Sequence, residues 1–216
     1  MAIDKLTLPV LISSKQAEFA VERDDIIRIM KPMPLLAVDA AENWAPEALP
    51  VEEKSVRQAA GCAIYVGLFG CIYSEPTVLE YKAAAGNSYR EILVYVKDCA
   101  TRQPKLADFL DQVADPKNGH KLVRYSEWST VRRRFRDHLW EAIGRMVQHA
   151  LRLGDPPAAM GEDSSVFDQR WQLERAALLD LGLPDDPQRA KELAILLENE
   201  KDAQTGGLLR RIFARH

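Results

Sequence analysis

Apolar and polar positions alternate along the chain in a repeating order. Short apolar runs, the size of buried strands, are each followed by a segment with apolar residues every three or four positions. A strand followed by a helix, repeated, is typical of a parallel sheet covered by helices. The strands are predicted at Leu6–Ser13, Leu35–Val38, Cys62–Phe69, Glu91–Val96 and Lys121–Tyr125.

The helical segments have clear ends. Pro32 and Pro34 follow the first, and Gly61 follows the second. Between the second strand and the second helix, residues 39–50 form a polar loop. The helices are predicted at Lys15–Lys31, Val51–Ala60, Pro76–Ala85, Pro104–Val113 and Ser129–Leu153.

These five repeats predict an α/β fold with a five-stranded parallel sheet in the flavodoxin-like order 2-1-3-4-5, since crossover connections are right-handed. In that order the connections reverse direction between strands 1 and 3. Ligands bind at this switch point, beside the carboxyl ends of the strands. The segments predicted to meet there are Ser13–Ser14 and Gly70–Glu80.

The composition changes after Leu153. We assign residues 1–154 to the α/β domain and residues 155–165, rich in Gly, Pro and Ser, to a linker. Helical patterns resume over residues 166–216 and predict a small helical appendage. We expect it to pack on the main domain or on a partner.

Composition narrows the class of protein. The chain has 216 residues, of which 47% are hydrophobic, and a net charge of -3, so we expect a soluble protein. No apolar run reaches the roughly 20 residues that span a bilayer, and the N-terminus lacks the features of a signal peptide. Cys62, Cys71 and Cys99 form no CxxC pair, which indicates a reducing cytoplasm and no zinc site.

A basic run lies on the last predicted helix, at Arg132–Arg134 and Arg136. It is typical of a solvated face or of an interface with an acidic surface of a second copy. The acidic overall balance argues against a nucleic-acid partner.

Glu80 is the candidate catalytic residue. Pro76 suits the first turn of a helix and places Glu80 one turn into it, on the same side as Thr77. A carboxylate there is either an ordinary helix-start residue, favoured by the helix dipole, or a group that acts on a bound sugar. Tyr73 and Ser74, in the preceding loop, can hydrogen-bond a sugar.

Other residues near the switch point have either a structural or a ligand-binding interpretation. Ser13 and Ser14 follow the first strand, where one could cap the next helix and the other contact a phosphate or ribose. Arg23 lies on an otherwise apolar helix face, where it snorkels, pairs with a carboxylate or faces a ligand. Asp39 and Trp44 belong to a loop that is either a lid or an ordinary surface loop.

Several common nucleotide-binding motifs are missing from the sequence. It contains no GxxxxGK[ST] phosphate loop, no GxGxxG fingerprint and no GxSxG elbow. These absences argue against a P-loop ATPase, an ordinary Rossmann dehydrogenase and a serine hydrolase of the elbow type.

Three blocks resemble a bacterial TIR-like family (domain of unknown function 4062). They are "VLISSKQAEFAVERDDI" at Val10–Ile26, "YVGLFGCIYSEPTVLEY" at Tyr65–Tyr81, and "ILVYVKD" at Ile92–Asp98 followed by "RQPKLADFL". Together they cover roughly Leu6 to Tyr125. The family is similar to Toll/interleukin-receptor domains and to nucleoside deoxyribosyltransferases.

The resemblance implies an enzyme that cleaves NAD at the nicotinamide bond, in antiphage defence or signalling. Glu80 would be catalytic, with Ser13, Ser14 and Tyr73 in the pocket and NAD as substrate rather than cofactor. Activity would require self-association or a separately encoded partner that binds the helical tail. The alternatives are a signalling module that binds nucleotides or itself without catalysis, and a deoxyribosyltransferase with Asp39 as the second acid.

Overall fold

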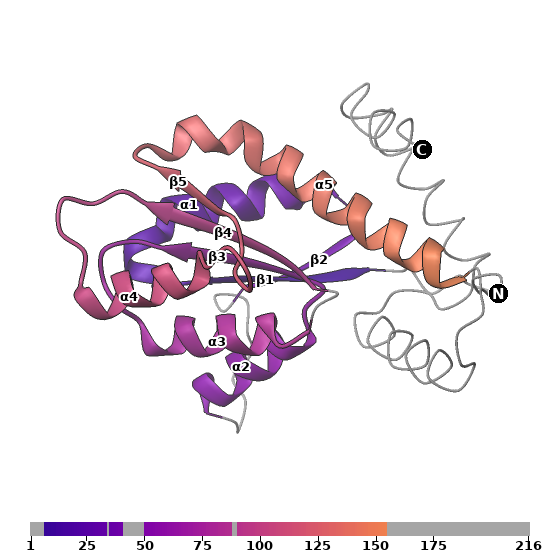
Figure 1. Cartoon of the computed structure of the whole chain (residues 1–216). Helices are drawn as coiled ribbons and strands as arrows, with labels where there is room; N and C mark the ends of the chain where they lie inside the picture. Colours follow the sequence, from indigo (N-terminus) through magenta and orange to yellow (C-terminus); the bar gives the residue numbers. More distant parts are fainter. Residues whose placement is uncertain (1–6, 34, 41–49, 88–89, 155–216) are drawn as a thin grey trace, which may run out of the picture. The chain divides into compact units, whose positions relative to one another are not determined.

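A computed structural model of the chain describes residues 7–33, 35–40, 50–87 and 90–154. It shows a five-stranded, all-parallel sheet in the order β2-β1-β3-β4-β5, which confirms the predicted fold class (Figure 1). The strands are β1 (Leu8–Ser14), β2 (Leu36–Asp39), β3 (Ile64–Phe69), β4 (Glu91–Lys97) and β5 (Leu122–Tyr125). The helices are α1 (Gln16–Met30), α2 (Val51–Gly61), α3 (Glu75–Ala85), α4 (Pro104–Val113) and α5 (Trp128–Gly154).

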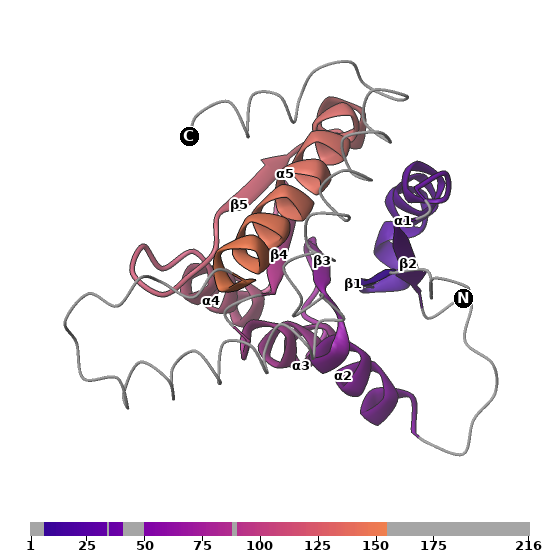
Figure 2. The same ribbon diagram turned by 90° about the vertical axis from the view of Figure 1, so that its right-hand side faces the viewer.

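Strand β3 lies at the centre of the sheet, and all six of its residues are buried. Its neighbours are β1 and β4. Gly67 of β3 lies between Ser13 of β1 and Val94 of β4. Figure 2 shows the strands side by side in this order. The continuous apolar sequence of β3 is explained by this position, because a central parallel strand is covered on both faces.

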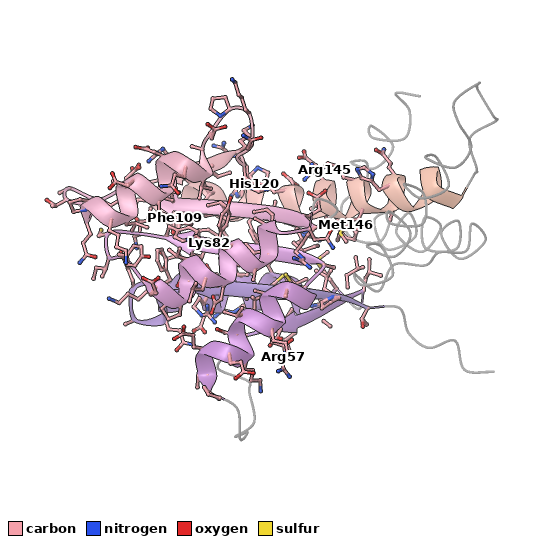
Figure 3. All side chains as sticks on the ribbon, turned by 60° about the horizontal axis from the view of Figure 1, so that its bottom comes forward. Arg57, Lys82, Phe109, His120, Arg145 and Met146 are labelled. Atoms are coloured by element: carbon pink, nitrogen blue, oxygen red, sulfur yellow. The ribbon has the colours of Figure 1, made fainter. Side chains whose placement is uncertain are left out.

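Helices α2, α3 and α4 cover one face of the sheet, and α1 covers the other (Figures 1 and 2). On the first face, Tyr65 and Phe69 of β3 pack with Tyr81 of α3 and with Phe109 of α4, which Figure 3 labels. On the second face, Tyr95 of β4 packs against aromatic side chains from the first turns of α5. Successive strand residues alternate between these two cores, as the pleat requires.

Two element boundaries differ from the prediction where the site lies. Strand β1 continues through Ser14, and α1 begins after Lys15, which occupies the N-cap position without a side-chain hydrogen bond. The predicted capping role of a serine is therefore wrong, because both serines still belong to the strand. Helix α3 begins at Glu75 rather than Pro76, with Ser74 at its N-cap position.

The chain divides into two compact units, residues 1–136 and 137–216. The sheet, helices α1 to α4 and the first turns of α5 belong to the first unit. Of the second unit, the structure describes residues 137–154, which continue α5. Leu6, Trp44, the predicted linker and the predicted appendage at 166–216 lie outside the described residues. No helix of the described part is long and apolar enough to cross a membrane.

Arg90 joins the ends of two helices to the sheet. Its side chain is buried, and its guanidinium donates to the carbonyl oxygens of Ala60 and Cys62, at the end of α2, and of Ala83 and Ala84, at the end of α3. The last carbonyls of a helix have no partner within the helix, so a buried cation there satisfies them and also complements the helix dipole. Both helices that flank the candidate site are held in this way.

We predict that Arg90→Met lowers the free energy of unfolding by about 2–4 kcal/mol, since several buried carbonyls lose their donor. Urea unfolding followed by circular dichroism measures this change. The matched control is Arg57→Met on the outer side of α2 (Figure 3), where an exposed i,i+4 pair with Glu53 is worth at most about 0.5 kcal/mol. Equal effects for the two variants would contradict the anchoring role of Arg90.

Candidate active site

Glu80 and Ser13 meet at the carboxyl end of β1. The hydroxyl of Ser13, which is buried, donates to Oε2 of Glu80, on the second turn of α3. Ser13 faces α3 because it shares the pleat position of Leu11, which belongs to the core beneath that helix. The predicted switch point therefore brings these two residues together, although they are 67 positions apart in the sequence.

The environment of Glu80 raises its pKa. Burial raises the pKa of Glu80 above its ordinary value, because a low-dielectric surrounding disfavours the charge. Hydrogen bonds from Ser13 and Ser55 and the positive charge of Arg23 act in the opposite direction and lower the pKa, but less strongly. Ser55 comes from α2 and Arg23 from α1, so residues of two helices and of β1 influence this pKa.

Arg23 lies on the opposite side of β1. It is 2% exposed, and its guanidinium donates to the carbonyl oxygen of Ile12 and to the hydroxyl of Ser14, each at 3.0 Å. Of the readings open from the sequence, snorkelling to solvent is excluded by this burial. Arg23 instead places a fixed positive charge beneath the end of β1.

Ser74 and Thr77 form the start of α3. The Thr77 hydroxyl is buried and donates to the Ser74 hydroxyl at 3.0 Å. The Thr77 carbonyl accepts a long hydrogen bond, 3.4 Å, from the hydroxyl of Tyr65. These two predicted residues therefore shape the helix start next to Glu80.

The loop between β3 and α3 is held by α1. Glu18, on the first turn of α1, accepts a hydrogen bond from the backbone N–H of Cys71 at 2.6 Å. A Cβ atom on Gly70 would lie 2.0 Å from the same carboxylate oxygen, so a side chain here would displace Glu18 from this hydrogen bond.

The same loop is also held from the start of α4. Arg102 donates to the Gly70 carbonyl at 2.8 Å, and the Gln103 backbone N–H donates to the Cys71 carbonyl at 2.9 Å. The Gln103 side chain in turn accepts from the backbone N–H of Tyr73 at 2.8 Å. The backbone that leads into α3 is thus fixed at successive residues.

Tyr73 lies at the rim rather than beside Glu80. Its hydroxyl donates to Glu75 at 2.9 Å, and the ammonium group of Lys105 lies 4.0 Å from the centre of its ring and 2.8 Å from Glu75. Tyr73, Glu75 and Lys105 link the starts of α3 and α4. The bond from Lys105 and that from Tyr73 lower the pKa of Glu75, the opposite of the shift at Glu80.

The other acidic residues near the sheet have different positions. Glu22 is buried and pairs with Lys97 at 2.8 Å, on the α1 side of the sheet. Asp39 ends β2 opposite Leu11, two positions before Ser13 along the neighbouring strand. Of these acids, Glu80 is the one that accepts a hydrogen bond from Ser13 at the end of β1.

Of the residues predicted from the sequence, the structure brings Glu80 and Ser13 into contact. Arg23 and Ser14 contact each other on the opposite side of β1. Ser74 and Thr77 lie at the start of α3. Tyr73 instead contacts Glu75 and Lys105. Sequence reasoning missed Tyr65, Ser55 and Glu18. Tyr65 carries a detectable signal, a tyrosine two positions before a glycine in the most apolar strand, since a buried tyrosine hydroxyl requires a partner.

Within the part of the chain that the structure describes, no group of His, Cys, Asp and Glu side chains is arranged to hold a metal ion. The three cysteines are free thiols. The side chains at the site are instead hydroxyls, one carboxyl group and one guanidinium. Such a set can hydrogen-bond sugar hydroxyls and stabilise a positive charge.

Comparison with known proteins leaves the family open. No protein-family model matches the chain, and no curated protein matches it. Among solved structures, the chain is similar to the CMP N-glycosidase BcmB of Clostridium botulinum, with 12% identity and a TM-score of 0.42 over 59% of this chain and 96% of that one. A likeness at this level does not bear on the reaction.

We predict that Glu80→Gln stabilises the fold at neutral pH and less so in acid. The raised pKa means that the folded protein holds this proton more tightly than the unfolded chain, so wild-type stability declines as pH rises above about 4.5 toward the folded pKa. Glutamine cannot ionise and avoids that decline. Urea unfolding of both proteins at pH 4.5 and 7.5 measures the difference.

Glu75→Gln, on the same helix, provides the matched control. Its pKa is lowered, so its carboxylate stabilises the fold at neutral pH, and the substitution is expected to have the opposite sign. Because Glu75 is exposed, that effect is small. If Glu80→Gln stabilised the fold equally at both pH values, the stabilisation would not come from removing the buried charge of Glu80.

Proposed function

We propose that this protein cleaves the N-ribosyl bond of a nucleotide, with NAD as the substrate and Glu80 as the catalytic residue. The observation that carries the proposal is the half-buried Glu80 carboxyl, held by Ser13 at the switch point of the sheet. Ligands of this fold class bind at that point. The resemblance of the three sequence blocks to TIR-like domains is part of the same proposal.

NAD suits a site with one carboxylate. Its nicotinamide is already cationic, so the C1′–N bond breaks with the electron pair passing to the ring nitrogen, and the leaving group departs neutral. Positive charge develops on the ribose, and water then forms the new bond to C1′ and releases a proton. A carboxylate beside the sugar stabilises that charge, most strongly where burial lowers the dielectric.

The remaining polar groups support this assignment. Ser13 holds one oxygen of Glu80, which fixes the carboxyl group in position before the substrate arrives. Arg23 and Ser14 lie beneath the end of β1, where a phosphate or ribose of a bound nucleotide would sit. A pair of acids, as in most glycoside hydrolases, is unnecessary when the leaving group needs no proton.

We predict that Glu80→Gln lowers the rate of NAD cleavage by at least about 100-fold, the usual effect of removing a group that stabilises transition-state charge. Purified protein at low and high concentration is incubated with NAD, and nicotinamide release is measured after separation of the products. Glu75→Gln, which changes an exposed carboxylate one turn away, should retain activity.

The outcomes separate the alternatives. Cleavage that rises steeply with protein concentration would indicate that assembly completes the site. Wild-type protein that binds NAD without turnover at any concentration would contradict the enzyme and favour a nucleotide-binding module. Base exchange on deoxynucleosides without NAD cleavage would favour the transferase.

A further inference from the structure

Arg102 joins two neighbouring strands at their carboxyl ends. Its Nε donates to the carbonyl oxygen of Gly70, the residue directly after β3, at 2.8 Å. Its Nη2 donates to the carbonyl oxygen of Lys97, the last residue of β4, at 2.7 Å. Nε and Nη2 share one edge of the planar guanidinium group, so these two backbone carbonyls occupy that edge.

The other edge of the Arg102 guanidinium is not used. A guanidinium carries five N–H donors in a fixed planar fork. The two hydrogens of Nη1 and the second hydrogen of Nη2 donate to no atom of the described residues. Nη1 and Nη2 together form an edge that fits a phosphate or a carboxylate in bidentate fashion.

Arg90 shows how an arginine differs when its only role is to anchor the backbone. It is 7% exposed, and its Nε, Nη1 and Nη2 all donate to carbonyl oxygens at the ends of α2 and α3. Arg102 is half-buried and holds the backbone with one edge alone. Its second edge is therefore available to a ligand.

The charge of Arg102 is not balanced by an acid. Both of its acceptors are neutral carbonyl oxygens, and no carboxylate of the described residues forms an ion pair with it. The acids of α1 that reach this edge of the sheet are bonded elsewhere. Glu22 pairs with Lys97, and Glu18 accepts from the backbone N–H of Cys71. A partly buried cation without a counter-ion is stabilised when an anion binds beside it.

The position of Arg102 suits the proposed site. Strand β3 lies next to β1, whose Ser13 holds Glu80, and β4 is the following strand. Neighbouring strands are about 4.8 Å apart, so the strand ends that Arg102 joins lie roughly 5–10 Å across the sheet from the end of β1. A ribose and its 5′-phosphate extend over a comparable length. Helix α4 begins directly after Gln103, and its N-terminal dipole also favours an anion here.

We propose that the free edge of Arg102 binds the 5′-phosphate of the ribose whose N-glycosidic bond is cleaved. The identity of this ligand rests on the proposed function. The preference for a phosphate does not, because it follows from the unused donors and the unbalanced charge of Arg102. The site would thereby select nucleotides over nucleosides and hold the ribose in place beside Glu80.

The test compares two ligands that differ by this one phosphate, nicotinamide mononucleotide and nicotinamide riboside. Their binding to full-length Glu80→Gln protein, which should consume neither, is measured by isothermal titration calorimetry. Adding Arg102→Met should weaken binding of the mononucleotide by about 10- to 100-fold, the loss expected for hydrogen bonds to a charged group. Binding of the riboside should not change.

Two variants at the same edge of the sheet serve as matched controls. Gln103→Leu removes another tie of the loop, the acceptor for the Tyr73 backbone N–H, without changing the charge. Lys105→Met removes a positive charge that pairs with Glu75. Neither should reduce the preference for the mononucleotide.

Several results would overturn the inference. One is an unchanged affinity for the mononucleotide in Arg102→Met. Another is an equal loss for the riboside, which would show that Arg102 only holds the loop. A third is an equal loss in Lys105→Met, which would show a general effect of charge. Should Arg102→Met not fold, Arg102→Lys decides, because a lysine keeps the charge without the fork, and an undiminished affinity there overturns the inference.

Inorganic pyrophosphate separates this inference from the proposed function. Wild-type protein that binds pyrophosphate, loses that binding in Arg102→Met and never cleaves NAD would retain the phosphate site and reject the reaction. NAD cleavage with the same KM in wild type and Arg102→Met would retain the reaction and overturn the site. Wild-type protein that binds neither pyrophosphate nor the mononucleotide would overturn the site as well.

Discussion

The two-residue period of β1 organises the polar chemistry of this protein. Consecutive serines at the end of the strand face opposite sides of the sheet, so Ser13 contacts Glu80 of α3 while Ser14 contacts Arg23 of α1. The strand itself is buried between β2 and β3. A carboxyl group and a guanidinium group are thus held on either side of one strand end, at the place where the sheet connections reverse direction.

The buried charged side chains of this protein are stable only because each has hydrogen-bonding or ionic partners. Arg23 donates to a carbonyl and a hydroxyl, Glu22 pairs with Lys97, and Arg90 donates to the ends of two helices. An unpartnered buried charge would destabilise the fold by several kcal/mol, on the order of 3–5. The hydrophobic core therefore determines the layers, while these anchored charges determine how α1, α2 and α3 meet the edge of the sheet around the site.

The sequence was sufficient to predict the helix and sheet layers and the proximity of Ser13 and Glu80. Its periodicity predicted the five strands and their order, and the switch-point rule then placed Ser13 near Glu80. The rule could not show that Ser14 remains in the strand, because serine before a helix usually caps it. Nor could it identify Tyr65, since an aromatic residue in an apolar strand is ordinarily core and only the fold shows that its hydroxyl reaches the Thr77 carbonyl.

Glu80 differs from the acids whose role is to stabilise the fold. Glu75 is exposed and its pKa is lowered by Lys105 and Tyr73, and Glu22 has a lysine at hydrogen-bonding distance. The hydrogen bonds to Glu80 come from hydroxyls, Arg23 acts on it at longer range, and burial still raises its pKa. Its ionised form therefore weakens the fold at neutral pH. The proposed reaction therefore rests on a buried carboxyl group of raised pKa that a strand hydroxyl holds at the switch point of the sheet.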